Sequence, residues 1–217
     1  MTVTLGPLVV EAADPTAVTR FWRAALGDEV FGRLMTVESE RQPKTVKNRV
    51  HFDVYVRELA VLLNLGATVL DDYPPMRATM ADVEGNEFCA FIEPALEPVP
   101  LAQVFAICTD SSDPRRLAAW WAAAVGADVD PGPDGVPRYL SGCAGWMDVT
   151  RDFDVVWKFN EVDDQRVAPN RWRWTVSDWP DSLVDPEHLV DPQHQVDPEH
   201  LVDPDGNEFS VRTSPAG

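Results

Sequence analysis

Two segments of the chain share one pattern of polar and apolar positions. Residues 12–27 and 111–126 each carry Asp-Pro, then apolar residues at helical spacing, then Gly. Asp is a favoured N-cap, Pro suits the first helical position, and Gly ends helices. The pattern therefore predicts two helices, capped by Asp14 and Asp113. The apolar runs that precede these helices predict strands at 8–13 and 104–109.

The similarity continues beyond the helices in the same order. Asn-Arg opens a strand-like alternation at Asn48 and again at Asn170, and the Gly-Asn-Glu-Phe sequence at Gly85 recurs at Gly206. Three blocks in one order indicate an internal duplication. We therefore predict two homologous domains, residues 1–93 and 102–213, joined by a linker rich in Pro and Glu at 94–101.

The two halves differ in two places. The offset between matching blocks grows from 99 to 122 residues, because the second half has extra strand-like sequence after its first helix; the first half is predicted to lack a hairpin there. The second half also carries a six-residue repeat at 184–204, which begins Val-Asp-Pro-Glu-His-Leu. A Pro every six residues forbids a continuous helix, so we expect a solvated loop. The alternative is a surface metal site formed by His188, His194 and His200.

Composition narrows the class of protein. Of 217 residues, 45% are hydrophobic and 25% are charged, as in globular proteins. The 18 Lys and Arg residues against 36 Asp and Glu give a formal net charge of −18, which opposes binding to nucleic acid or to an anionic membrane. The first residues lack the basic segment of a signal peptide, and Cys89, Cys108 and Cys143 show no CxxC spacing. We expect a cytoplasmic protein with free thiols.

In its motifs the chain resembles the vicinal-oxygen-chelate superfamily, in its glyoxalase-like, bleomycin-resistance-like branch. The similar segments are ADPTAVTRFWRAALG, PKTVKNRVHFDVYV, LGATV and DVEGNEFCAFIE in the first half, and SDPRRLAAWWAAAVG, APNRWRW and VDPDGNEFSV in the second. The resemblance implies an α+β fold of tandem glyoxalase-like domains, built from βαβββ modules whose curved mixed sheets form cups. It also implies either a monomer with an internal pseudo-dimer or a homodimer.

The resemblance also implies where a metal would bind. Catalytic members of the family hold one divalent metal in the cup, with ligands from the first strand, the end of the first module, the strand opening the second module, and the last strand. In the first half, the first strand offers only Gly6 or Pro7, which have no ligating side chain. The strand opening the second module offers His51, and the last strand has Cys89 where the family has Glu.

The remaining positions weaken a metal site further. Glu38 or Glu40 is the candidate at the end of the first module. The matching positions of the second half are Ala106, Arg173 and Ser210, and an Arg at a ligand position opposes a bound cation. We therefore expect no cofactor, with a divalent metal on His51 and Cys89 as the alternative.

Alternation along the strands gives candidate cup residues, because residues two apart share a face. His51 then shares a face with Asp53 and Tyr55, and Cys89 shares one with Glu87 and Phe91. Trp146 and Trp157 lie on the extra strands and are candidates for stacking on a ligand, whereas Trp172 and Trp174 are predicted to be core. The catalytic candidates are His51 and Asp53, and the ligand-binding candidates are Glu11, Tyr55, Glu87, Cys89, Phe91, Trp146, Trp157, Arg173 and Ser210.

Each candidate has a structural alternative. Arg49 with Glu87, and Arg171 with Glu208, are predicted to form ion pairs between neighbouring strands. His51 beside Asp53 suits a general base, or it is a buried side chain without chemistry. Cys89 lacks an evident basic neighbour that would lower its pKa, which favours a small strand hydrophobe over a nucleophile.

Three functions remain open at this stage. The leading prediction is a metal-independent glyoxalase-like protein that binds a small organic molecule in a sheet-lined cup, with or without transforming it. The excess of acidic groups favours a basic or an aromatic ligand. The alternatives are a divalent-metal-dependent lyase, isomerase or dioxygenase of the same superfamily, and a non-catalytic degenerate scaffold.

Overall fold

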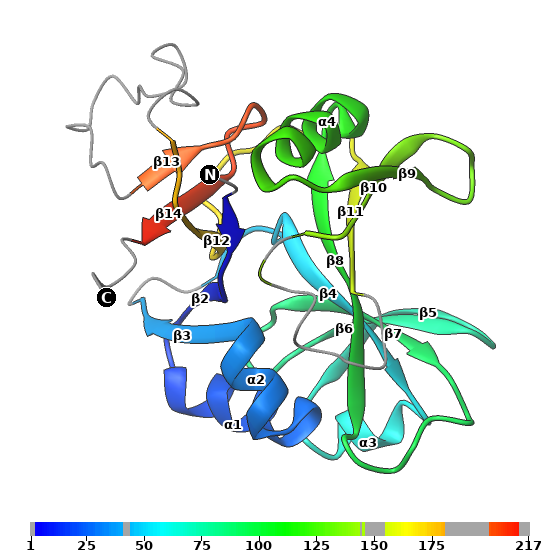
Figure 1. Cartoon of the computed structure of the whole chain (residues 1–217). Coiled ribbons are helices and arrows are strands. Elements are labelled where there is room, and N and C mark those ends of the chain that lie inside the picture. The colour runs from blue at the N-terminus through cyan, green and yellow to red at the C-terminus, as the bar shows by residue number, and fades with distance from the viewer. Residues whose placement is uncertain (1–2, 41–43, 144, 146–154, 181–199, 213–217) are drawn as a thin grey trace.

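Two curved mixed sheets organise the described part of the chain (Figure 1). The computed structural model describes residues 3–40, 44–143, 145, 155–180 and 200–212. Both sheets contain parallel and antiparallel pairs, which confirms the predicted α+β class with curved mixed sheets. Trp146 and most of the six-residue repeat, including His188 and His194, lie outside the described residues.

The six-stranded sheet joins the beginning of the chain to its end. Its order is β13-β14-β12-β2-β3, and β1 also pairs with β12. The strands span Thr4–Leu5 (β1), Leu8–Ala12 (β2), Met35–Ser39 (β3), Trp172–Ser177 (β12), His200–Val202 (β13) and Glu208–Arg212 (β14). Since β1, β2 and β3 come from the first half and the others from the second, the two halves build this sheet together.

The eight-stranded sheet is also shared between the halves. Its order is β5-β6-β7-β4-β8-β11-β10-β9. The strands span Val50–Val56 (β4), Thr68–Tyr73 (β5), Arg77–Ala81 (β6), Glu87–Ile92 (β7), Ala102–Ser111 (β8), Asp128–Pro131 (β9), Pro137–Ser141 (β10) and Val156–Glu161 (β11). The antiparallel pair β4–β8 is the seam, and it runs from Val50 opposite Thr109 to Val56 opposite Ala102.

The capped helices lie where the sequence predicts them. In α1 (Pro15–Leu26) the Asp14 side chain accepts a hydrogen bond from the backbone N–H of Ala17, and in α4 (Pro114–Val125) Asp113 accepts one from Arg116. The shorter helices are α2 (Asp28–Leu34) and α3 (Ala60–Leu63). α2 and β3 follow α1 where the second half has β9 and β10. Among the described residues, no helix combines the length and apolar character of a membrane span.

Each half centres its core on one tryptophan of its first long helix. Trp22 packs edge-on against Phe52, Phe88 and Trp172, with ring centroids 5.1 to 5.9 Å apart within this group. Trp121 occupies the matching position in α4, against Trp157 and Phe209. Trp172 and Trp174 are at most 1% exposed, which confirms that they are core. Such aromatic pairs contribute about 0.5–1.5 kcal/mol beyond the burial of their area.

The repeated Gly-Asn-Glu-Phe sequence has a structural role. The buried Asp82 accepts a hydrogen bond from the indole N–H of Trp22 at 3.1 Å and two from the Asn86 amide. Asp203 repeats the arrangement with Trp121 at 3.2 Å and with Asn207. The motif therefore ties the first helix of each half to the last strand-turn of the same half.

Candidate active site on the eight-stranded sheet

One face of the eight-stranded sheet gathers the side chains that can carry chemistry. On β4, Phe52 points into the core against Trp22 and Trp172, so His51 and Asp53 point to the opposite face. Residues opposite them in register share this face. We call this surface the cup face, and its members are His51, Asp53, Tyr55, Arg77, Thr79, Cys89, Phe91, Phe105, Cys108, Tyr139 and Lys158.

Asp53 lies at the centre of the cup face and binds an ammonium group. The Lys158 Nζ donates a hydrogen bond to Asp53 Oδ2 at 2.8 Å, and the side chains are 16% and 7% exposed. Burial lowers the pKa of Lys158, but the attraction of Asp53, with smaller contributions from Cys108 and Tyr139, outweighs burial and raises it. Lys158 is therefore a cation at neutral pH, and its amine is not available as a nucleophile.

His51 lies beside this pair as a neutral imidazole. Its Nε2 is 3.7 Å from Asp53 Oδ1, and its Nδ1 is buried with no hydrogen-bond partner among the described residues. Burial lowers the pKa of His51 below its ordinary 6.5, although Asp53 and Asp110 oppose this shift. At neutral pH the ring can accept a proton but carries no charge.

The two thiols of the cup face are protonated at neutral pH. Burial, and then the negative charge of Asp53, raise the pKa of Cys89 to about 11. The same two causes raise the pKa of Cys108 well above its ordinary value. A thiol rather than a thiolate is a poor nucleophile. The position of Cys89 on β7 therefore supports the structural interpretation of this residue over the nucleophile.

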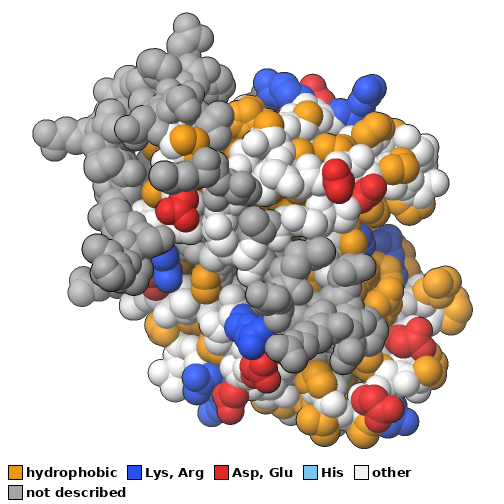
Figure 2. Space-filling model, in the orientation of Figure 1, with side chains coloured by type: hydrophobic (Ala, Val, Ile, Leu, Met, Phe, Trp, Pro, Cys, Tyr) orange, Lys and Arg blue, Asp and Glu red, His pale blue; other side chains and the backbone are white. Residues whose placement is uncertain are grey.

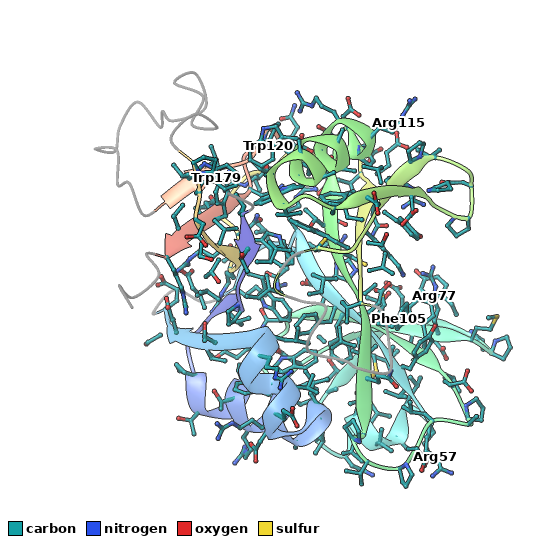
Figure 3. All side chains as sticks on the ribbon, in the orientation of Figure 1. Arg57, Arg77, Phe105, Arg115, Trp120 and Trp179 are labelled. Carbon is teal, nitrogen blue, oxygen red and sulfur yellow. The ribbon has the colours of Figure 1, made fainter. Side chains whose placement is uncertain are left out.

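Aromatic rings surround the ammonium of Lys158. Its Nζ is 4.6 Å from the ring centroid of Phe105, 5.8 Å from that of Tyr139 and 5.9 Å from that of Phe91. Tyr55 stacks on Phe105 with centroids 4.0 Å apart. The register of β4 and β8 skips Phe105, because a bulge separates Ala106 from Val104. Figure 3 labels Phe105 on the inner part of this sheet, with Arg77 near it.

Some predicted cup residues lie on the other sheet. Glu11 is on β2, Arg173 on β12 and Ser210 on β14. Arg173 forms ion pairs with Glu11 and, at 3.0 Å, with Glu38. The expectation that Glu11 shares one cup with His51 is therefore wrong, because β2 of the first half belongs to one sheet and β4 of the same half to the other.

Two predicted ion pairs are also wrong. Glu87 binds Lys44 at 2.5 Å and accepts the backbone N–H of Asn48, while Arg49 pairs with Asp164 at 2.9 Å. In the second half Glu208 pairs with Arg166, and Arg171 pairs with Glu84. In both halves the Glu side chain accepts a hydrogen bond, at 3.0 to 3.1 Å, from the backbone N–H of the Asn that precedes the Arg, and it does not pair with the Arg.

Trp157 does not line the cup face. It is fully buried, stacks with Phe159 and packs against Trp121 and Trp174. Its indole N–H donates to Thr109 Oγ1 at 2.9 Å. Because neighbours on a strand face opposite ways, the core position of Trp157 places Lys158 on the cup face. The prediction that Trp157 stacks on a ligand is therefore wrong, because its ring is buried in the core.

Sequence reasoning missed six members of the cup face, which are Arg77, Thr79, Phe105, Cys108, Tyr139 and Lys158. Arg77 and Thr79 lie on β6 of the first half, and the other four come from strands of the second half, which was assigned to a separate cup. The alternation of Trp157 with Lys158 on a predicted strand was the available signal. It was not usable without knowing that β8 lies beside β4 and that β11 lies beside β8.

The sequence matches one family model twice. Residues 7–91 and 106–212 both match the model described as Glyoxalase-like domain, and together they span most of the chain. The chain belongs to this glyoxalase-like family.

Solved structures of similar fold agree with this membership. Glyoxalase I from Zea mays is 15% identical, with a TM-score of 0.55, and the match covers 97% of this chain and 92% of that one. A putative dioxygenase from Bacillus subtilis subsp. subtilis str. 168 is 11% identical, with a TM-score of 0.55, and the match covers 100% of this chain and 86% of that one. At these identities the likeness shows the fold. No curated protein sequence matches the chain significantly.

The glyoxalase-like fold raises the question of a metal. Within the described residues, His51, Asp53 and Cys108 bring one ligand atom each within 4.8 Å of one another, and zinc accepts such donors. One feature opposes a divalent ion there. Lys158 already binds one Asp53 oxygen at 2.8 Å, so a metal at this position would meet the ammonium beside one of its ligands.

Proposed function

We propose that this glyoxalase-like protein binds a small organic molecule on the cup face without a metal. The ion pair of Lys158 and Asp53 carries the proposal, because it puts a fixed cation at the centre of a partly exposed aromatic surface. Ligand sites combine apolar walls with a few oriented polar groups. Tyr55, Phe91 and Phe105 supply the walls here, and Lys158 supplies the polar group. The free thiols of Cys89, Cys108 and Cys143 fit a reducing compartment such as the cytoplasm.

The cup face also limits the reactions that it can support. The protonated thiols of Cys89 and Cys108 and the protonated amine of Lys158 are poor nucleophiles for covalent catalysis. A neutral His51 can accept a proton, and the Lys158 ammonium can stabilise negative charge that develops on a ligand oxygen. The reaction class that these residues support is therefore proton transfer next to a carbonyl group.

Ligand screening on metal-depleted protein tests the proposal. We expect fragments from an aromatic library to bind the chelator-treated chain in ligand-observed NMR, and to lose binding in the Phe105→Ala variant. Val167→Ala is the control, since it truncates an apolar side chain that is 78% exposed. If the screen finds no fragment whose binding is lost in Phe105→Ala, the proposal is refuted and a non-catalytic scaffold is favoured.

The same samples test the metal-dependent alternative, which the cluster of His51, Asp53 and Cys108 favours. We expect elemental analysis of untagged protein to find no stoichiometric divalent metal, and ligand binding to be the same before and after chelation. One metal per chain, lost in His51→Ala, would replace our proposal with a metal-dependent enzyme.

A further inference from the structure

The charges of the cup face differ from those of the whole chain. The chain carries a formal charge of −18, yet the carboxylates nearest to Lys158 each bind a lysine. Glu87 binds Lys44 at 2.5 Å, and Asp110 binds Lys47 at 2.6 Å. Asp53 is balanced by Lys158, which leaves the exposed Arg77 on β6. Among the described residues, no carboxylate lies within ion-pair distance of Arg77. The carboxylates beside Lys158 are therefore neutralised, while the acidic Asp71 and Asp130 lie further out, opposite Thr79 and Tyr139 on the outer strands.

The position of the Lys158 ammonium decides which charge a ligand can bring. An ammonium has three N–H donors, and Lys158 gives one to Asp53. The same group already occupies the aromatic surface formed by Phe91, Phe105 and Tyr139, within 6 Å of each ring centroid. An organic cation would have to displace it or bear its repulsion. A carboxylate or an enolate oxygen would instead meet an available N–H donor.

The rings define the rest of the ligand. Tyr55 and Phe105 stack with an interplanar angle of 20°, and Phe91 stands edge-on to Phe105 at 5.2 Å. All three are half-buried, so a planar group can cover them and gain apolar burial. Arg77 neighbours Phe91 in register across β6 and β7, and it adds a second cation at the edge of this surface.

From this geometry we infer that the cup face selects an anionic aromatic ligand, with a carboxylate or enolate oxygen on Lys158 and a ring against Tyr55, Phe91 and Phe105. This inference rests on the proposed function and adds the sign of the ligand's charge. The anionic ligand inferred here is opposite in charge to the basic ligand that the sequence favoured. That expectation counted Glu11, which lies on the other sheet, and did not place Lys158 or Lys44 beside the cup face.

Three probes of similar size and different charge test the inference. They are phenylacetate, 2-phenylethanol and 2-phenylethylamine, with affinities measured by NMR titration against the full chain at low and high salt. We expect phenylacetate to bind most tightly and 2-phenylethylamine most weakly. A charge-assisted hydrogen bond is worth about 1.5–3 kcal/mol, so Lys158→Met should weaken phenylacetate by roughly ten- to hundredfold. The same variant should strengthen 2-phenylethylamine, because its ammonium can replace that of Lys158 beside Asp53.

Two further variants separate the site from the overall charge. Lys158→Arg keeps a cation and should keep the order of the three binding affinities. This variant also tests the inference if Lys158→Met fails to fold. Arg115→Met removes one exposed positive charge from α4, far from Phe105 (Figure 3), and should leave all three affinities unchanged.

Each contrary outcome has a distinct meaning. Tighter binding of 2-phenylethylamine than of phenylacetate to the unmodified chain would overturn the inference, as would equal binding of all three probes. In either case the proposed function stands, because a ligand still binds. If no probe binds at millimolar concentration, the inference also fails. The proposed function fails only if the library screen finds no fragment that depends on Phe105.

Discussion

Two buried aspartates have the shifted pKa values that are typical of catalytic residues, but their contacts are structural. Asp82 and Asp203 each sit in the conspicuous motif that ends their half, and each has a raised pKa because burial penalises its charge. Both lie under the first helix, hydrogen-bonded to Trp22 and Trp121. A perturbed pKa alone would mark them as functional candidates. Their partners, all within the motif and the helix, assign them to the architecture of each half.

The raised pKa of Asp203 predicts how the free energy of unfolding depends on pH. Burial raises its pKa from 3.8 to about 6, so the folded protein keeps a proton that the unfolded chain releases between these values. The stabilisation from Asp203 is complete below about pH 4 and is lost as the pH rises through 6. We expect the unmodified chain to lose free energy of unfolding relative to Asp203→Asn over this range, by as much as about 3 kcal/mol. Urea denaturation at a series of pH values measures this difference.

A second measurement avoids any damage from the substitution. The carboxyl carbon of Asp203 should titrate near pH 6 in carbon-detected NMR of the unmodified chain. The exposed Asp134 is the internal control, because hydrogen bonds from Val136 and Arg138 lower its pKa below 3.8. Titration of Asp203 near pH 4, close to that of Asp134, would show that Asp203 is not desolvated as described.

At the scale of elements, local signals in the sequence were sufficient for some features and not for others. Helix caps depend on residues within one turn, so Asp14 and Asp113 located α1 and α4 correctly. Strand alternation likewise placed His51, Asp53 and Tyr55 on one face. Which strand lies beside which depends on contacts far apart in sequence, and no local pattern encodes the pairing of β4 with β8. For this reason Lys158 was missed and Glu11 was assigned to the wrong cup.

The helix caps support a quantitative prediction. Asp113→Ala removes the acceptor for the Arg116 backbone N–H, at 3.1 Å in the structure, and should lower the free energy of unfolding by about 1 kcal/mol. Asp14→Ala should cost a similar amount, since it makes the same contact with Ala17. Asp163→Ala, at an exposed loop position, is the control with no cap to lose. Equal stability of all three variants in urea denaturation would contradict the capping role.

At the scale of the molecule, the duplicated chain builds its sheets across its halves. Figure 1 shows β2 and β3 beside β12 and β14, while β4 to β7 continue into β8 to β11. Among the described side chains on the side of the molecule drawn in Figure 2, acidic and basic groups are interspersed. The pairing of Lys158 with Asp53 at the centre of the cup face depends on which strands the fold brings together, rather than on the net charge of the chain.

This sharing predicts how the halves behave when they are separated. Cutting the chain within the linker at 94–101 breaks no strand, but each half alone loses a partner for β4 or β8 and exposes a long unpaired edge. We expect each half expressed alone to aggregate or remain unfolded. The two halves expressed together should co-purify as a 1:1 complex with the circular dichroism spectrum of the intact chain. A half that folds alone as a monomer would instead show that it is an independent domain. The β4–β8 seam would then be a contact between finished domains, and Lys158 would reach Asp53 only after they dock.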